Sequence, residues 1–513
     1  MSAARRWMSG GLASGTRMGV GAATQLASVP IFLSCWSPSQ YGAWLIVLGL
    51  GPLLTAIDVG HQNYLAYAFM NAPDEASLGR VLASSLIAGT VIGILGVVAA
   101  TGLVWSGAVA FMLKGAEAAV VEQAQTLVVL QSVIWLLVGS FGGLLTRAMA
   151  RIGQFPRAAW WGVVEAVGTG VAPAVAVLMG GDLMAAGLAL AAATVIVNAP
   201  MLGDFARLWS AVPERVGRPD LRLAARNAGV SLGIAARDLS AQMRQQGVRL
   251  VLAPMVGLSQ MTAFATTRTG ANIAVQGLNA VLWPLEPELL RFVRERDAER
   301  VEAALAVNWG LLMVVVVPTL MAVQFVAAPA FAMWTRGQVP FDPVLFALLS
   351  ATVAVFAFAQ TATLVVRGAN RVRVQMATSL LSTAVVLIGI AVTATSVGIR
   401  GAAVALIAGE VCVAVIYQDV ARRWITAAVL CWPAALARPA ILATVSLVAA
   451  LLAIGWAPEF GAVIAAVAGA VHIGLCLAFY RALPALARER IAGWVSPLGA
   501  ASGRVWRARG DRR

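Results

Sequence analysis

Apolar runs of about twenty residues recur from one end of this chain to the other, and few charged residues interrupt them. A run of that length, folded as a helix, crosses the hydrocarbon core of a lipid bilayer. Because 60% of the residues are hydrophobic and only 12% are charged, the chain has too few charges to cover its apolar side chains in water. The sequence therefore predicts an all-α polytopic membrane protein.

The runs predict about fourteen transmembrane helices. Their approximate ranges are 13–34, 42–66, 81–104, 125–146, 157–179, 183–206, 227–252, 260–284, 304–327, 343–366, 375–396, 400–418, 437–455 and 460–480. The seventh and eighth runs are the weakest, because they contain Arg237, Asp238, Arg244, Arg249 and Arg268.

Positive charge alternates between successive loops. With the N-terminus taken as cytoplasmic, nearly all loop arginines fall on the inner side, and only Lys114, Arg336 and Arg400 fall outside. The positive-inside rule then places both termini in the cytoplasm and requires an even number of crossings. A net charge of +14 distributed in this way suits anionic lipid headgroups, so membrane lipids rather than nucleic acid are the expected partners.

The chain also resembles itself after a shift of 220 residues. The shift places Arg17 on Arg237, Gln25 on Gln245, Arg80 on Arg300, Arg147 on Arg367 and Arg151 on Arg371, and segment 39–44 on segment 259–264. Both halves begin on the same side of the membrane, which predicts two pseudo-symmetric six-helix lobes, a parallel repeat about an axis along the membrane normal. Two such lobes are expected to enclose a substrate between them.

The repeat and the runs divide the chain into five parts. These are an N-lobe at 1–206, a cytoplasmic linker at 207–226, a C-lobe at 227–420, an appended pair of helices at 421–480 and a basic cytoplasmic tail at 481–513.

Ionisable residues within the spans are the first candidates for a site, because such side chains are costly in a bilayer unless they face water or a partner. The candidates for substrate binding are Arg17, Arg237, Arg244, Arg249 and Arg268, together with the repeat-related Gln25 and Gln245. Arg237 and Arg244 share one helix face, and the guanidinium fork suits phosphate and pyrophosphate. Structural ion pairs, such as one between Arg237 and Asp238, or side chains that reach to a nearby surface remain the alternative.

Four acids within the spans are candidates for a coupling proton: Asp58, Glu165, Asp238 and Glu410. A carboxyl group in a medium of low dielectric constant can hold a proton near neutral pH. Asp58 lies near the predicted inner end of the second span, where a capping or interfacial role is an equal expectation. Glu165 and Glu410 are expected to lie deeper in their spans than Asp58.

Other residues exclude several classes of function. The two histidines, His61 and His472, are isolated, and no nucleophile, base and orienting group occur together, so the protein is not expected to be an enzyme. No cluster predicts a metal site, and no Gly-Lys-Ser/Thr loop predicts nucleotide hydrolysis, so no cofactor is expected.

The segment from Pro38 to Trp44, followed by Asp58-Val59-Gly60, resembles the Wzx-type oligosaccharide flippases of the multidrug/oligosaccharidyl-lipid/polysaccharide (MOP) superfamily. The similarity continues at the loops around Arg147 and Arg371 and covers spans one to twelve.

The resemblance implies a carrier in the bacterial inner membrane that moves undecaprenyl-pyrophosphate-linked oligosaccharide to the periplasmic leaflet by alternating access, for surface polysaccharide or lipopolysaccharide biosynthesis. It implies that Arg17, Arg237, Arg244 and Arg268 hold the pyrophosphate and acidic sugars. A polysaccharide polymerase or export machinery would be a partner.

Three alternatives remain. Cation-coupled exporters of small amphipathic compounds in the same superfamily typically carry an acid in the first span, and residues 13–34 contain none. Lipid II flippases carry an arginine-rich opening signature that is not recognisable around Arg17. A membrane enzyme that ligates or polymerises glycans is the third.

Overall fold

The computed structural model describes residues 3–212, 217–282, 285–369, 371–427, 430, 432–485 and 487–488. These residues form helices and short connections, with no strand among them. Residues 213–216 of the predicted linker and 489–513 of the predicted tail lie outside the described residues.

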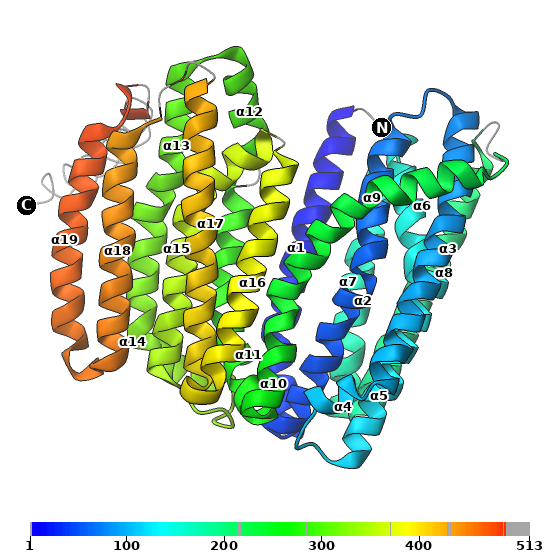
Figure 1. Cartoon of the computed structure of the whole chain (residues 1–513), viewed down its shortest axis with the longest axis horizontal. Helices are drawn as coiled ribbons and strands as arrows, with labels where there is room; N and C mark the ends of the chain where they lie inside the picture. The colour runs from blue at the N-terminus through cyan, green and yellow to red at the C-terminus, as the bar shows by residue number, and fades with distance from the viewer. Residues whose placement is uncertain are drawn as a thin grey trace, which may run out of the picture. The chain divides into compact units, whose positions relative to one another are not determined.

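The chain divides into two compact units (Figure 1). Unit 1 comprises Met1–Ile273, Pro329–Asp342 and Ser379–Gly409, and unit 2 comprises Ala274–Ala328, Pro343–Thr378 and Glu410–Arg513. The boundaries of the N-lobe, the C-lobe and the appended pair stay a prediction.

Ten α-helices and two π-helices of the described chain lie wholly in unit 1. They are α1 (Ala3–Cys35), α2 (Pro38–Met70), α3 (Glu75–Trp105), α4 (Ala108–Met112), α5 (Ala118–Ile134) with the π-helix η1 (Trp135–Gly139) and α6 (Ser140–Arg151), α7 (Phe155–Leu178), α8 (Leu183–Ser210), and α9 (Leu221–Gln242) with the π-helix η2 (Met243–Gly247) and α10 (Val248–Val256).

Unit 2 contains α12 (Leu285–Glu295), α13 (Ala298–Leu311), the π-helix η3 (Leu312–Val316), α15 (Pro343–Gly368), α18 (Ala434–Trp456), the short helix η4 (Pro458–Phe460) and α19 (Gly461–Ala482). Four helices contribute residues to both units: α11 (Leu258–Leu282), α14 (Val317–Trp334), α16 (Val372–Val397) and α17 (Ile399–Ala427).

All fourteen predicted runs coincide with helices, which confirms the all-α polytopic fold. Twelve helices of the described chain are long and apolar enough to cross a membrane. The other two runs form the continuous helix α9–η2–α10 and helix α11, which carry Arg237, Arg244, Arg249 and Arg268 and do not qualify as candidate spans. Length and composition together therefore make the chain a multi-pass membrane protein.

Helix α3 shows how the units face lipid. Its apolar side chains Val91, Ile94, Leu95 and Val98 are 48–60% exposed, and they follow one another at helical spacing along one face. The opposite face is buried and consists of small residues, including Ser84, Ser85, Ala88 and Gly89. A helix with small residues inside and branched apolar residues outside is stable in hydrocarbon, because small residues allow close packing of neighbouring helices.

The start of α2 packs against the start of α11 within unit 1. Ser37 and Gln40 form a capping box at the N-terminus of α2, with Pro38 in the first turn of the helix. Helix α11 begins at Leu258, which is the residue that the 220-residue shift pairs with Pro38. The Thr262 hydroxyl donates to the Pro38 carbonyl at 2.7 Å. The helix starts therefore recur with the sequence repeat.

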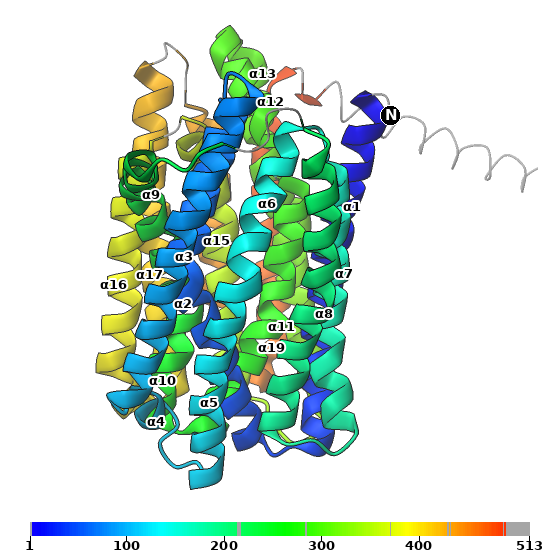
Figure 2. The ribbon, with the colours of Figure 1, turned by 90° about the vertical axis from the view of Figure 1, so that its right-hand side faces the viewer.

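The central feature of unit 1 is the oblique crossing of α9 over α2, visible in Figure 1. Gly60 allows it, since a Cβ at that position would lie 2.4 Å from the Cα of Ala235. Helices α1, α7 and α8 lie side by side in the same unit, as Figure 2 shows. The close contact of α2 with α9 brings polar residues of both helices together.

Candidate functional site

Helix α2 carries a polar segment in an otherwise apolar span. Asp58, His61 and Gln62 are at most 2% exposed, and Asn63 follows them directly. His61 Nδ1 lies 3.0 Å from the Ser231 hydroxyl of α9. Buried polar groups are stable only with hydrogen-bond partners, so these residues require polar groups on neighbouring helices.

Arg147 of α6 supplies the main partner. Its Nη1 donates to Gln62 Oε1 at 2.9 Å and to the Gly143 carbonyl at 3.0 Å, and its Nη2 donates to Asn63 Oδ1 at 2.8 Å. Gly143 leaves room for this contact, because a Cβ there would lie 2.0 Å from Gln62 Oε1. One guanidinium fork therefore binds two adjacent amides of α2.

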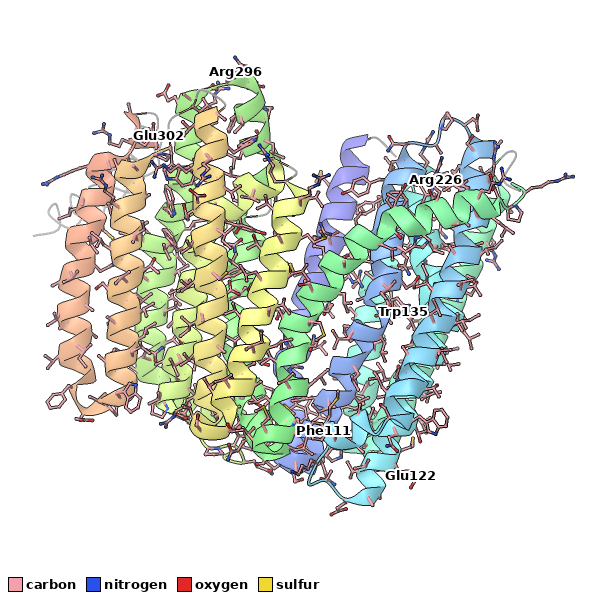
Figure 3. All side chains as sticks on the ribbon, in the orientation of Figure 1. Phe111, Glu122, Trp135, Arg226, Arg296 and Glu302 are labelled. Carbon is pink, nitrogen blue, oxygen red and sulfur yellow. The ribbon has the colours of Figure 1, made fainter. Side chains whose placement is uncertain are left out.

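The Asp58 carboxylate lies on one side of Arg147. Its Oδ2 accepts from Gln62 Nε2 at 2.9 Å and from Trp135 Nε1 at 2.8 Å. Trp135 opens the π-helix η1, and Figure 3 places it about half-way along the helices of unit 1. π-Helical turns are frequent at functional sites because they redirect side chains. Here the turn directs an indole donor at a buried acid.

The other oxygen of Asp58 lies beside Ser140 of α6. Oδ1 of Asp58 and Oγ of Ser140 are both buried, and the Ser140 side chain interacts with the carboxylate. Both oxygens face Gly89, whose Cβ, if present, would lie 3.9 Å from Asp58 Oδ1 and 3.2 Å from Ser140 Oγ. Side chains from α2, η1 and α6 therefore surround the carboxylate.

Asp238 of α9 lies on the other side of Arg147. Its Oδ2 accepts from Asn63 Nδ2 at 2.9 Å, and its Oδ1 accepts from Arg237 Nε and Nη2 at 3.0 and 2.9 Å. We call the chain of contacts from Asp58 through Gln62, Arg147 and Asn63 to Asp238 the acid network. It connects two carboxylates from different helices through one arginine.

A second group of polar residues lies in η2 and α10, which continue helix α9, and in α11. Arg268 of α11 is 9% exposed, and it donates to the backbone and side-chain oxygens of Gln245 at 3.1 and 3.2 Å. Gln245 belongs to the π-helix η2, which also carries Arg244. Arg249 follows in α10 and interacts electrostatically with Tyr41 of α2. We call Arg244, Gln245, Arg249 and Arg268 the arginine cluster.

The remaining predicted residues lie elsewhere. Arg17 of α1 forms an ion pair with Glu165 of α7 at 3.5 Å, and their side chains are 58% and 36% exposed. Arg17 also interacts electrostatically with Arg147, so it borders the acid network. Gln25 is half-buried in α1, and Glu410 is half-buried in the part of α17 that belongs to unit 2.

One interpretation requires correction. Asp58 was expected near the inner end of a span, with a capping or interfacial role as an equal possibility. It lies well inside α2, which ends at Met70, and it caps no helix. The helix is longer than its apolar run, because the polar residues after Asp58 are buried against α6 and α9 and therefore continue it.

Sequence reasoning missed Arg147, Gln62, Asn63 and Trp135 as members of a site. Arg147 was assigned to an inner loop, although it lies in α6. The sequence did contain a signal: four polar residues lie close together within one apolar span, namely Asp58, His61, Gln62 and Asn63. Such a group predicts polar partners on a neighbouring helix.

The chemistry of the two groups is electrostatic. They contain carboxylates, guanidinium groups and amides, which bind protons and anions but do not form a nucleophile and base pair. Among the described residues, no three His, Cys, Asp or Glu side chains gather as metal ligands would.

Comparisons with known proteins identify the fold. No protein-family model and no curated protein sequence matches the chain. Several solved structures match its fold. An inward-facing MATE-family multidrug resistance transporter of the MOP superfamily matches with a TM-score of 0.65 and 15% identity, over 81% of this chain and 98% of the other.

Two further solved structures also match the fold of this chain. The lipid II flippase MurJ, in an inward closed conformation, matches with a TM-score of 0.63 and 10% identity, over 92% of this chain and 98% of MurJ. A MOP superfamily transporter from Pyrococcus furiosus, whose binding pocket is described as having reverse polarity, matches with a TM-score of 0.57 and 16% identity, over 82% and 96%. The chain therefore has the fold of MOP superfamily transporters.

Proposed function

We propose that this protein is a flippase that moves a lipid-linked oligosaccharide, carried on undecaprenyl pyrophosphate, across the bacterial inner membrane by alternating access. The observation that carries the proposal is the arginine cluster in α9–η2–α10 and α11, two long helices more polar than the twelve candidate spans, within a MOP-type fold. We place both termini in the cytoplasm, as the loop charges predict.

Arginine is the side chain best suited to this substrate. A pyrophosphate carries several oxygens in fixed geometry, and a guanidinium group binds two of them at once, which an ammonium group does not. Arg268 is held by two hydrogen bonds to Gln245, so its fork is oriented before a substrate arrives. We propose Arg237, Arg244, Arg249 and Arg268, with Gln245, as contacts for pyrophosphate, and Arg17 and Gln25 as contacts for the attached sugars.

We assign energy coupling to the acid network. Asp58 and Asp238 are joined through Arg147, so a proton taken up by one carboxyl group weakens its attraction to the guanidinium group. That change alters the contact of α2 with α6 and α9. A proton on Asp58 could therefore bias the helix packing of unit 1, while Glu165 and Glu410 are the further proton-site candidates.

Flipping by purified protein tests the proposal. Proteoliposomes would contain undecaprenyl-pyrophosphate oligosaccharide with a fluorophore on the glycan, and a membrane-impermeant quencher would report transfer between leaflets. We expect Arg237→Ala with Arg244→Ala to slow flipping by about tenfold or more, since a charged hydrogen bond contributes about 1.5–3 kcal/mol. Unchanged flipping by this double variant would refute the pyrophosphate assignment.

Arg157→Ala is the control for removal of an arginine from the surface. Arg157 is 52% exposed and pairs with Asp204, outside both polar groups. Its loss should leave flipping unchanged. An equal effect of the control and the double variant would indicate a general effect of charge rather than a binding site.

A cation-coupled exporter of small amphipathic compounds is the second candidate, because the acid network and the likeness to a MATE-family structure are compatible with it. Deletion of the gene discriminates the two. Loss of surface polysaccharide supports the flippase, whereas altered tolerance to cationic drugs with normal polysaccharide supports the exporter.

A membrane enzyme that ligates or polymerises glycans would be recognised differently. Its glycan product would form on the outer leaflet, and its deletion would cause no defect in translocation.

A further inference from the structure

A basic pocket lies where α3 and α9 begin, away from the acid network and the arginine cluster. Its volume is about 410 Å³, and its lining residues are Ser77, Arg80, Val81, Asp220, Arg222, Leu223 and Arg226. Figure 3 shows Arg226 at one end of unit 1, while Phe111 and Glu122 lie at the other end and Trp135 lies between them. The pocket is therefore at the end of the helices rather than at the middle of the membrane.

The chain ahead of α9 is fastened to α3 and so shapes this pocket. A Cβ at Gly217 would lie 2.2 Å from the backbone nitrogen of Arg80, so only glycine fits there. The Asp220 N–H donates to the Ser84 hydroxyl at 2.9 Å. Asp220 Oδ1 accepts from the N–H groups of Arg222 and Leu223 at 2.8 and 3.1 Å and caps α9. These contacts fix the two helix starts relative to one another.

The charge of the pocket is strongly positive. Arg80, Arg222 and Arg226 are exposed, and none of the ion pairs between described residues includes them. Arg222 and Arg226 are four residues apart, so they share one face of α9, where like charges repel. An anion in the pocket would remove that repulsion.

Two nearby acids are already engaged. Among the described residues, Asp220 is the only acid that lines the pocket, and its Oδ1 caps α9. Asp74, close to Arg80, accepts from the Ser77 N–H at 2.7 Å and caps α3. Hydrogen bonds from Ser77, and after them the charge of Arg80, lower the pKa of Asp74 below its usual value, so it remains ionised. Three guanidinium groups thus remain for an external anion.

The position of the pocket along α3 indicates which anion it binds. Helix α3 is one of the twelve candidate membrane spans, and Arg80 lies in its second turn, at the depth where a crossing helix meets the headgroups. Arginines at this depth meet lipid phosphates on the side of the membrane that the loop charges predict to be cytoplasmic. We propose that this pocket binds the phosphate of an anionic phospholipid headgroup and thereby joins the starts of α3 and α9. The site is independent of the proposed transport substrate.

Native mass spectrometry of the full protein tests this site, with lipid nanodiscs of phosphatidylglycerol or phosphatidylcholine as the source of lipid. We expect phosphatidylglycerol to be retained after detergent extraction and to raise the Tm, and phosphatidylcholine to do neither. Arg222→Gln with Arg226→Gln should weaken retention about 30-fold, since each arginine near an anionic surface contributes about 1 kcal/mol.

The matched control is Arg207→Gln with Arg218→Gln. It removes the same charge from exposed residues that do not line the pocket, and it should retain the lipid as the parent protein does. Gly217→Ala is a third variant that keeps every charge but displaces Arg80, and it should also weaken retention. Its Tm without added lipid shows whether it still folds.

Two results would overturn the proposal. Equal loss of phosphatidylglycerol in the pocket variant and the control variant would show that only net charge matters. An equal rise in Tm with inorganic phosphate alone, without preference between the two lipids, would show that the pocket binds free phosphate rather than a headgroup. Neither result bears on flipping of the lipid-linked oligosaccharide.

Discussion

Arg147 should be the most important single residue for the stability of unit 1. It donates to Gln62 and Asn63 from two different nitrogens, and through these amides it connects Asp58 with Asp238. Arg147→Ala would remove both hydrogen bonds and leave the two carboxylates without the cation between them.

The expected cost follows from those contacts. Hydrogen bonds to a charged group contribute about 1.5–3 kcal/mol each to the free energy of unfolding. Removal of one partner from a buried ion pair typically costs about 3–5 kcal/mol. We therefore expect Arg147→Ala to lower the free energy of unfolding by about 3–5 kcal/mol. Arg147→Lys should recover only part of the loss, because a lysine cannot reproduce the fork.

The assay is thermal and denaturant unfolding of the purified protein in detergent, followed by the summed fluorescence of its sixteen tryptophans. Arg151→Ala is the control on the same helix. Arg151 is exposed, and its hydrogen bond to the Ala72 carbonyl is long at 3.4 Å. If both alanine variants lost the same stability, the acid network would not be a structural centre of unit 1.

Three further predictions concern the same groups. Gly139→Ala should destabilise the protein by about 1–3 kcal/mol, because its Cβ would lie 2.6 Å from the Trp135 ring; unchanged unfolding would show that the ring can move at no cost. Asp58→Asn should keep the fold but abolish any effect of an imposed proton gradient on flipping in proteoliposomes, and a preserved effect would remove Asp58 from the coupling site. Arg268→Lys should slow flipping about fivefold or more, because lysine cannot keep both bonds to Gln245; a parent-like rate would show that orientation of the fork is unimportant.

The fold could be predicted from the sequence because the bilayer imposes one length and one polarity on every crossing helix. All fourteen ranges fall on helices of the described chain, and the two weakest runs are the ones that do not qualify as candidate spans. The helix ends were less predictable. Helix α2 runs from Pro38 to Met70 rather than over 42–66, because a capping box begins it and buried polar residues extend it.

The candidate site could be predicted only in part, because its contacts join distant segments. The sequence identified Asp58, Asp238, Arg237 and the arginine cluster from their position in apolar runs. It could not indicate that Arg147, far from both acids in the sequence, lies between them. The π-helices η1 and η2 were equally unpredictable, since they depend on how Trp135 and Gln245 meet neighbouring helices.

The repeat itself separates the two polar groups. The 220-residue shift preserves Arg147 as Arg367, but it places Leu278 and Leu282 where Asp58 and Gln62 stand in the first half. Arg367 is exposed, whereas Arg147 is half-buried among amides. The residues that the shift pairs with Asp58 and Gln62 are therefore apolar, and the acid network has no counterpart at these positions. Under the proposed function, this asymmetry assigns the coupling acid to the first half and the anion-binding arginines to α9, α10 and α11.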